Sequence, residues 1–163
     1  MKIFKLPILI IFVAFCLSCG KDKAPENDGA VYNLNPQLLL QLINEKRTAG
    51  CNCAGKPQQP VPVVKWNTIL AEAAYRHSVD MKTHKNLSHT SSDGRSHIDR
   101  VKELGYNSNN AGENIAVGYA NEKAVIDGWL SSEGHCLNIM NKTYTEVGAG
   151  RDGNYWTLVL AQK

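Results

Sequence analysis

Two β-prone runs at the carboxyl end of the chain predict a sheet. The first, Val147–Arg151, has glycine at alternate positions, so another backbone or a ligand is expected to approach it closely. The second, Tyr155–Ala161, combines the aromatic and aliphatic residues that are typical of a strand. Asp152-Gly153 lies between the two runs and is typical of a hairpin turn. We therefore expect a small antiparallel sheet, covered by the elements that precede it.

Most of the residues before this hairpin have helical periodicity. Asn35-Pro36 is a typical helix start, and apolar residues then recur at helical spacing until Gly50. A loop is expected over Gly50–Pro62, and a short strand is expected later in the chain, around Ile115 and Val117. Three further helices are expected, over residues 69–85, 96–104 and 121–129. The predicted fold class is α+β, with helices covering a small antiparallel sheet.

The first 18 residues have the pattern of an export signal. Lys2 and Lys5 precede the apolar run Leu6–Leu17, which is shorter than the roughly 20 residues of a membrane-spanning helix. Cys19-Gly20 follows at once, which resembles a bacterial lipoprotein signal cleaved before a lipidated cysteine. The alternative is an ordinary secretory signal in which Cys19 is incidental. The expected organisation is a signal peptide over residues 1–18, lipidated Cys19 with a polar tether over 19–34, and the folded domain over 35–163.

Charge argues against a nucleic-acid partner. Without its signal, the chain has 16 basic and 15 acidic residues, and basic residues neither cluster nor alternate with aromatic ones. We expect an exported monomer on the periplasmic or cell-surface side of a membrane, held there through Cys19.

Three of the five cysteines remain in the mature domain once Cys16 is removed and Cys19 is lipidated. Disulfides persist in exported proteins, so we expect either Cys51 or Cys53 to be bridged to Cys136. A bridge within the Cys-x-Cys pair would be strained. The alternative is a zinc site of Cys51, Cys53, His135 and Cys136, which lacks a second well-spaced pair of ligands.

The polar residues most suggestive of function lie in and just before the stretch Ala111–Met140. Glu113 stands in a Gly-Glu-Asn triplet, and His135 follows a Ser-Ser-Glu-Gly turn. Polar side chains beside glycine at the edge of regular elements usually face a cleft. His89, in the loop Asn86–His89, is the natural third member. We expect His89, Glu113 and His135 to converge on one pocket.

The other histidines are expected to be structural or exposed. His77 and His84 lie seven residues apart on one helix, which makes a poor chelate. We interpret His77 as a partly buried residue with satisfied hydrogen bonds, His84 as a surface residue and His97 as an exposed residue of a first helical turn.

The order of the motifs resembles the CAP superfamily of cysteine-rich secretory proteins, antigen 5 and pathogenesis-related 1 proteins, in its bacterial secreted branch. The resemblance covers about residues 36–162. Its motifs are Ser88-His89, Gly-Glu-Asn-Ile-Ala at 112–116, Trp129, Gly134-His135, Asn-Ile-Met at 138–140, Val-Gly-x-Gly at 147–150 and the final Tyr-Trp strand.

This resemblance implies an α-β-α sandwich with a central antiparallel sheet and a large open cleft. In the family two His and two Glu residues face the cleft. His89, Glu113 and His135 match three of them, whereas Ser132 stands where the second Glu is expected and Glu133 lies one position later. The resemblance therefore implies a ligand-binding cleft of His89, Glu113, Ser132 and His135.

Three kinds of function remain open for this group. His89 and His135 can bind zinc or another divalent metal, with Glu113 as a further ligand or in support. The same three residues could also serve a metal-assisted or general-base hydrolase of the peptidase type, with Glu113 orienting an imidazole that acts as the base. The sequence offers no convincing nucleophile. They can also form a buried network that only holds loops together. We expect a binding module for a divalent metal or a small apolar, lipid or other envelope-derived ligand or protein partner, rather than an enzyme.

Overall fold

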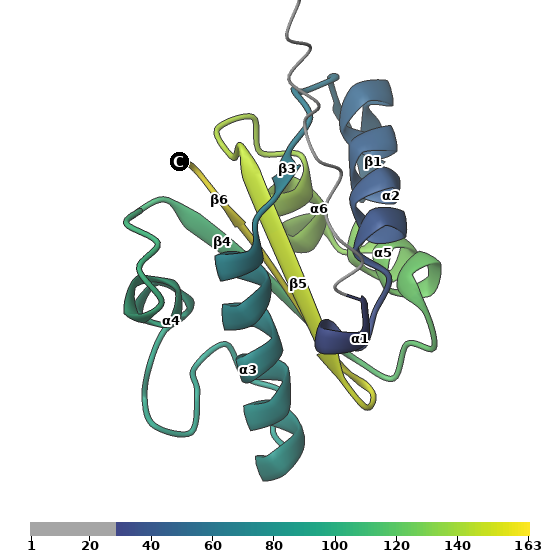
Figure 1. Cartoon of the computed structure of the whole chain (residues 1–163). Coiled ribbons are helices and arrows are strands. Elements are labelled where there is room, and N and C mark those ends of the chain that lie inside the picture. Colours follow the sequence, from purple (N-terminus) through teal and green to yellow (C-terminus); the bar gives the residue numbers. More distant parts are fainter. Residues whose placement is uncertain (1–28) are drawn as a thin grey trace, which may run out of the picture.

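The computed structural model describes residues 29–163 (Figure 1), so the predicted signal peptide, Cys19 and most of the predicted tether lie outside the described residues. The helices are α1 (Gly29–Tyr32), α2 (Pro36–Ala49), α3 (Thr68–His84), α4 (His97–Glu103), α5 (Glu122–Ser131) and α6 (Glu133–Ile139). The strands are β1 (Cys51–Cys53), β2 (Lys56–Gln58), β3 (Lys65–Trp66), β4 (Ala111–Val117), β5 (Glu146–Asp152) and β6 (Tyr155–Ala161). Within this part of the chain, no helix combines the length and the apolar character that crossing a bilayer requires.

The central sheet has four strands in the order β3-β5-β6-β4. Strand β6 pairs antiparallel with both β5 and β4, whereas the two-residue strand β3 pairs parallel with β5. The sheet is therefore antiparallel except at one edge. Strand β4 is the opposite edge, and it carries Glu113.

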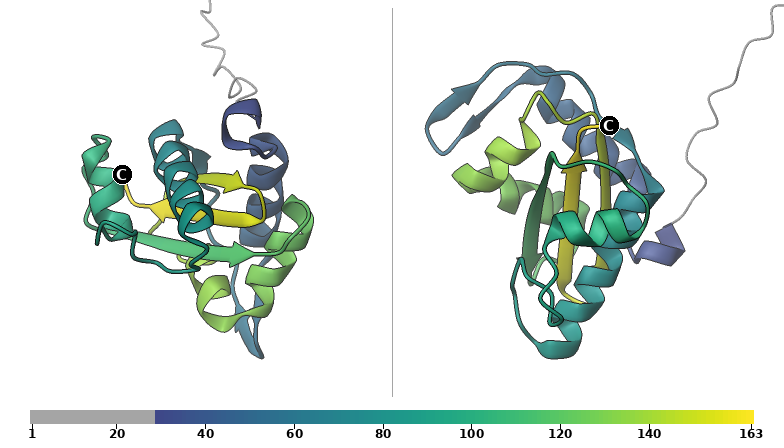
Figure 2. Two further views of the ribbon diagram at one scale, coloured as in Figure 1. Left: turned by 90° about the horizontal axis from the view of Figure 1, so that it is seen from below. Right: turned by 90° about the vertical axis from the view of Figure 1, so that its left-hand side faces the viewer.

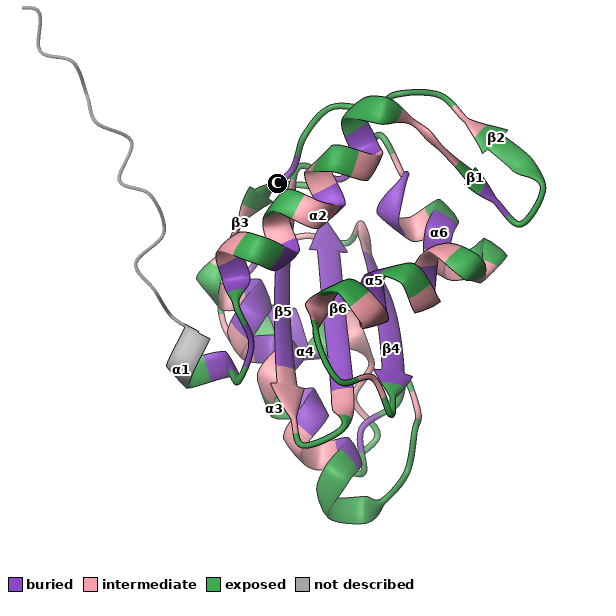
Figure 3. Cartoon of the chain, turned by 90° about the vertical axis from the view of Figure 1, so that its right-hand side faces the viewer, coloured by how far each residue is buried: buried purple, intermediate pink, exposed green. Residues whose placement is uncertain are grey.

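Helices cover both faces of this sheet, as Figures 2 and 3 show: α3 and α4 lie on one face, and α2, α5 and α6 lie on the other. The α+β class and the α-β-α layers are thus confirmed. Strands β5 and β6 are buried along most of their length, because both faces are covered. A Cβ atom at Gly148 would lie 2.2 Å from the backbone nitrogen of Ala71 in α3, and one at Gly150 would lie 2.3 Å from Tyr75 Cα. The glycines of β5 therefore allow the backbone of α3 to approach.

Several elements differ from the sequence prediction. Tyr32 and Leu34, assigned to the tether, are buried in the core, so the folded part begins before Asn35. The predicted loop Gly50–Pro62 contains the hairpin β1–β2. Its two turn residues, Ala54 and Gly55, both have positive φ, as the tight hairpin turn requires.

Two turns also differ from the prediction. The second half of the predicted turn, Glu133-Gly134, is the start of α6, so His135 and Cys136 lie on a helix. The turn between β5 and β6 is formed by Gly153 and Asn154, one residue later than expected, because Asp152 and Tyr155 are the last paired residues.

The disulfide joins Cys53 to Cys136, with 5.4 Å between their Cα atoms. This confirms the predicted bridge and identifies its partner. Cys51 is free and partly buried. Residues two apart on a strand point to the same face, so β1 directs both of its cysteines toward α6.

Candidate functional site

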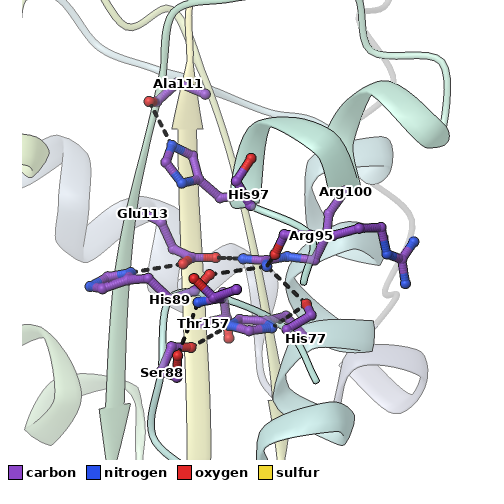
Figure 4. A network of polar contacts seen from close by, with 12 residues as sticks. His77, Ser88, His89, Arg95, His97, Arg100, Ala111, Glu113 and Thr157 are labelled. Carbon is purple, nitrogen blue, oxygen red and sulfur yellow. Dashed lines mark hydrogen bonds and ion pairs between the residues drawn. The ribbon is translucent and has the colours of Figure 1, made fainter. Parts of the chain in front are cut away.

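Glu113 is a buried carboxylate with two cationic partners. Its side chain is 1% exposed, and its Oε1 accepts a hydrogen bond of 2.8 Å from His89 Nδ1. Its other oxygen pairs with Arg100 Nη2. Figure 4 shows the carboxylate of Glu113, on β4, between the imidazole of His89 and the guanidinium of Arg100, on α4. The His89 side chain is 55% exposed, so the pair connects a buried charge to a solvent-facing ring.

Arg100 organises the loop that carries His89. Its Nη1 donates to the carbonyl oxygen of His89 at 3.1 Å, to Ser91 Oγ at 2.9 Å and to the carbonyl oxygen of Arg95 at 3.1 Å. Behind it, Ser91 Oγ lies 3.2 Å from His77 Nδ1, and His77 Nε2 donates to the carbonyl oxygen of Ser88 at 2.8 Å. The loop is thus held from α3 and α4, and the buried His77 has both ring nitrogens satisfied, as predicted (Figure 4).

The network shifts two pKa values in opposite directions. Burial alone would raise the pKa of Glu113, but the hydrogen bond from His89 and the charge of Arg100 outweigh it, so the pKa is lowered. The same hydrogen bond raises the pKa of His89 against the effect of burial. Glu113 is therefore ionised at neutral pH, and it stabilises the protonated form of His89.

His135 is half-buried on α6 and has the opposite tendency. Burial lowers the pKa of its imidazole, and the nearby charge of His89 lowers it further. Asn114 Nδ2 donates to the carbonyl oxygen of His135 at 3.0 Å, and Asn138 Nδ2 donates to the carbonyl oxygen of Glu113 at 3.2 Å. These two amides, themselves 3.0 Å apart, fasten α6 to β4 and fix the position of His135 relative to Glu113.

Side chains also occupy the open edge of β4. Three backbone carbonyl oxygens of β4 accept hydrogen bonds from side chains. The oxygen of Ala111 accepts from His97 Nε2 at 3.1 Å, that of Glu113 from Asn138 Nδ2, and that of Ile115 from Trp129 Nε1 at 3.2 Å. Bonds of this kind protect an edge strand against pairing with another strand. His97 is therefore partly buried and bonded to β4, and its prediction as an exposed residue was wrong. His84 is at the surface, as expected.

An open groove of about 330 Å³ extends from His135 along the carboxyl-terminal half of β4. Ser132 links α5 to α6 here without a side-chain capping bond. Most of the groove is apolar, and Leu87 and Val117 are exposed beside it. The groove is lined by Leu87, Ile115, Ala116, Val117, Tyr119, Gly128, Trp129, Ser131, Ser132 and His135.

The structure brings the predicted residues together unequally. His89 and Glu113 are in direct contact, and His135 lies close enough to His89 for the charge of His89 to lower the pKa of His135. Ser132 and His135 line the groove, whereas Glu133 points away and pairs with Lys56 of β2 at 2.5 Å. In residues 29–163, the only three His, Cys, Asp or Glu residues whose ligand atoms all lie within 4.8 Å are Cys51, Cys53 and Cys136. His89, Glu113 and His135 therefore do not form a closed cage of ligand atoms.

A divalent metal fits this group in part. Both carboxylate oxygens of Glu113 are engaged, so Glu113 can orient His89 but is not free to bind an ion. With Nδ1 bonded to Glu113, Nε2 of His89 is the nitrogen available for a metal, and the imidazole of His135 is the second. Water would have to complete the coordination.

Arg100, Asn114 and Asn138 belong to the site but were not among the predicted site residues. The two asparagines stand inside quoted motifs, Gly-Glu-Asn and Asn-Ile-Met, and this was the available signal. Arg100 lies in a short helix among several charged residues, and its burial could not be read from that pattern.

Residues 40–159 match the model of the family described as CAP, the cysteine-rich secretory protein family. The chain belongs to the CAP family. The match extends from α2 to β6, so it includes the His89–Glu113 pair, His135 and the groove. Ser132 stands where the resemblance implies the second carboxylate of the cleft.

The CAP domain is similar to parts of longer bacterial proteins. It is 36% identical over 118 residues to the uncharacterized membrane protein YlbC of Bacillus subtilis, a match that covers 72% of this chain and 34% of that protein. A crystal structure of an extracellular SCP-domain protein from Bacillus anthracis superposes with a TM-score of 0.73 at 30% identity, over 86% of this chain and 44% of that one. An outer surface protein of Borrelia burgdorferi shares the fold, with a TM-score of 0.67 at 17% identity over 78% of this chain and 91% of that one. This chain spans between a third and a half of the length of the two Bacillus subtilis relatives that it matches.

Proposed function

We propose that this protein is an exported, lipid-anchored binding module of the cell envelope. The support for export and anchoring is the basic start, the apolar run Leu6–Leu17 and the Cys19-Gly20 pair, together with the likeness to the extracellular SCP-domain protein of Bacillus anthracis. The anchor is tested by metabolic labelling with palmitate. Cys19→Ser should abolish labelling, whereas Cys16→Ser should not. Retention of the label by Cys19→Ser would contradict the anchor.

The ligand that suits the groove best is a small amphipathic molecule. The observation that carries this proposal is the apolar groove that ends at an imidazole. A volume of about 330 Å³ lies at the lower end of the range of small-molecule sites. Trp129 and Ile115 are buried residues of its lining, so the body of the ligand should be apolar.

The polar end of the groove favours an anionic head group. The raised pKa of His89 makes this ring a charged hydrogen-bond donor near and below neutral pH. Ser132, in the lining of the groove, offers a hydroxyl. A carboxylate can accept from both, since charge-assisted hydrogen bonds are the stronger ones. We therefore propose a medium-chain carboxylic acid, or an envelope lipid with an equivalent anionic head, as the ligand class.

A divalent metal is the other ligand that this end of the groove could take. The arrangement that favours it is the carboxylate of Glu113 hydrogen-bonded to the far nitrogen of His89, as around metal-binding histidines. Arg100 opposes it, because a second positive charge lies against the same carboxylate. An anionic ligand would suit this local charge better.

The ligand proposal is tested by titration calorimetry with dodecanoate and its methyl ester. Dodecanoate should bind at pH 6 about tenfold more tightly than the ester, because the ester lacks the charge that His89 recognises. His89→Gln should remove this difference. No binding of either compound would contradict the proposal.

Two leucines provide a matched control. Leu87, which lines the groove, and Leu38 of α2 are both exposed to solvent. Leu87→Ser should weaken dodecanoate binding several-fold, whereas Leu38→Ser should leave it unchanged. Equal effects of the two substitutions would show that the compound binds elsewhere.

A hydrolase is the second candidate, and the opposite pKa shifts of His89 and His135 favour it. A ring that holds its proton beside one that stays neutral can act as a general acid and a general base. His135→Asn should then abolish hydrolysis of envelope-derived peptides or esters while the thermal midpoint stays unchanged. Unchanged hydrolysis in that variant would exclude this role for His135.

A further inference from the structure

Three sulfur atoms meet between β1 and α6. Cys51 Sγ lies 3.6 Å from Cys136 Sγ and 4.0 Å from Cys53 Sγ, and the latter two form the disulfide. Cys53 and Cys136 are fully buried, whereas Cys51 is partly exposed. The bridge is thus closed to solvent, and the neighbouring thiol is open to it.

The hairpin β1–β2 presents both of its cysteines to the same partner. Cys51 and Cys53 are alternate residues of β1, so both side chains point to one face. Figure 3 shows this hairpin projecting beside α6, away from the central sheet. Besides the disulfide, one exposed ion pair, Lys56 with Glu133, ties the hairpin to α6. A two-stranded hairpin is only marginally stable by itself, so small shifts along α6 are expected.

The two possible bridges to Cys136 restrict the chain almost equally. The sequence separations are 83 residues from Cys53 and 85 residues from Cys51, so the loop-closure entropy barely distinguishes them. Local packing decides, and it favours the observed bridge because Cys53 is buried in the core cluster. Burial also raises the pKa of the Cys51 thiol, while Lys46 opposes this rise. The thiol form therefore dominates at neutral pH, and the observed bridge persists.

We propose that Cys51, Cys53 and Cys136 form a thiol–disulfide exchange site whose substrates are external dithiols. In this exchange Cys51 replaces Cys53 in the bridge to Cys136. The disulfide then includes the partly exposed sulfur of Cys51. The site lies outside the His89–Glu113 network and the groove, and it does not depend on the proposed ligand.

The exchange balances without a further reagent. The Cys51 thiolate attacks Cys136 Sγ, the Cys51–Cys136 bond forms as the Cys53–Cys136 bond breaks, and Cys53 leaves as a thiolate that takes up the proton lost by Cys51. A thiolate of the external dithiol then attacks Cys51 Sγ, and Cys136 leaves as a thiolate. The second thiol of the dithiol attacks its own mixed disulfide and releases Cys51. The chain ends with three thiols, and the dithiol ends as a disulfide.

The first test uses Cys53→Ser in the full chain, refolded with glutathione disulfide and mapped by differential alkylation and mass spectrometry. The expected product is a Cys51–Cys136 disulfide, and Cys51→Ser should keep Cys53–Cys136. Free Cys51 and Cys136 thiols in a Cys53→Ser chain of native circular dichroism would overturn the proposal.

The second test does not require the chain to fold with the alternative Cys51–Cys136 bridge. The full wild-type chain, Cys51→Ser and Cys51→Ala are each reduced with dithiothreitol, and alkylation of Cys53 and Cys136 is followed over time. Loss of the Cys51 sulfur should slow reduction about tenfold, since the external thiol then has only buried sulfurs to attack. Equal rates in all three proteins, at equal stability to urea, would show that Cys51 plays no part.

Discussion

His89 and Glu113 are joined by a 2.8 Å hydrogen bond between an exposed imidazole and a carboxylate that is almost completely buried. Arg100 holds the other carboxylate oxygen from α4. A buried charge thereby controls the protonation of a ring at the surface. His135, whose pKa the charge of His89 lowers, lines the apolar groove. Stability and the proposed ligand recognition therefore depend on the same residues.

Loss of the Glu113 carboxylate should strongly destabilise the fold. Glu113→Ala leaves the buried Arg100 without its counter-charge, although Arg100 keeps its hydrogen bonds to the His89 loop. We expect the free energy of unfolding to fall by about 3 kcal/mol, measured by urea denaturation. Glu133→Ala breaks only the exposed pair with Lys56 and should cost less than about 1 kcal/mol. Similar losses in the two variants would contradict the buried-pair interpretation.

This coupling changes how the role of Glu113 can be tested. Glu113→Gln removes a charge that the fold uses, so a loss of activity in that variant would not separate catalysis from stability. Substitutions of His135, which makes no ion pair with a carboxylate in the described residues, separate them better.

The two imidazoles should titrate on opposite sides of their ordinary pKa of 6.5. Proton NMR of the ring resonances should show the pKa of His89 above this value and that of His135 below it. Glu113→Gln should bring the pKa of His89 down, because its hydrogen bond to a charged acceptor is lost. Unchanged titration of His89 in this variant would mean that Glu113 does not control it.

These shifts also set the pH dependence of stability. The folded pKa of His89 is raised, so its contribution is complete below pH 6.5 and is lost as the pH rises through the folded value. The folded pKa of His135 is lowered, so its effect has the opposite sign: stability is lost as the pH falls below 6.5. His135→Asn should therefore be less sensitive than the wild type to acidification from pH 7 to pH 5, measured by urea denaturation. A larger sensitivity would contradict the burial of this ring.

The close contact of β5 and α3 predicts that Gly148 cannot be replaced. A Cβ atom there would meet backbone atoms of Leu70 and Ala71, which cannot rotate away. Gly148→Ala should lower the free energy of unfolding by about 3 kcal/mol or prevent folding. Gly134→Ala is the matched control, because nothing lies near its Cβ and the residue is helical. That change should stabilise by roughly 0.4–1 kcal/mol, and destabilisation of equal size at both positions would be unexpected.

Zinc titration calorimetry tests the metal alternative. If the two imidazoles bind Zn²⁺, micromolar binding should disappear in the His89→Ala/His135→Ala double variant and persist in His84→Ala. Affinity should rise with pH, since the metal competes with the proton that Glu113 stabilises on His89. Absence of zinc binding in the disulfide-bonded wild-type protein would contradict the metal alternative and leave the proposed groove ligand.

Particular residues show what the sequence could and could not predict. Asn35-Pro36, the apolar spacing of α2 and α3 and the final hairpin depend on local signals, and these elements formed as expected. Helix α6 was missed because Ser-Ser-Glu-Gly resembles a turn, although Ser132 and Glu133 are also typical of a helix start. The hairpin β1–β2 was missed because cysteine, glycine and proline dominate its composition.

The site divides in the same way. His89 and Glu113 could be paired from their motifs, since the motifs carry the polar residues themselves. Arg100 could not, because its place in the network depends on α4 packing against β4, a tertiary contact that no local pattern in its helix records. The choice of Cys53 over Cys51 is likewise tertiary, since both residues point toward α6 and burial decides between them.

NMR mapping of the full chain during titration with dodecanoate tests the central claim most directly. Amide and side-chain resonances of Leu87, Val117 and Trp129 should shift together with the His135 ring, and the His89 ring should shift at pH 6 as it meets the carboxylate. Shifts confined to another surface, or no shifts at saturating dodecanoate, would contradict the groove beside His135 as a binding site.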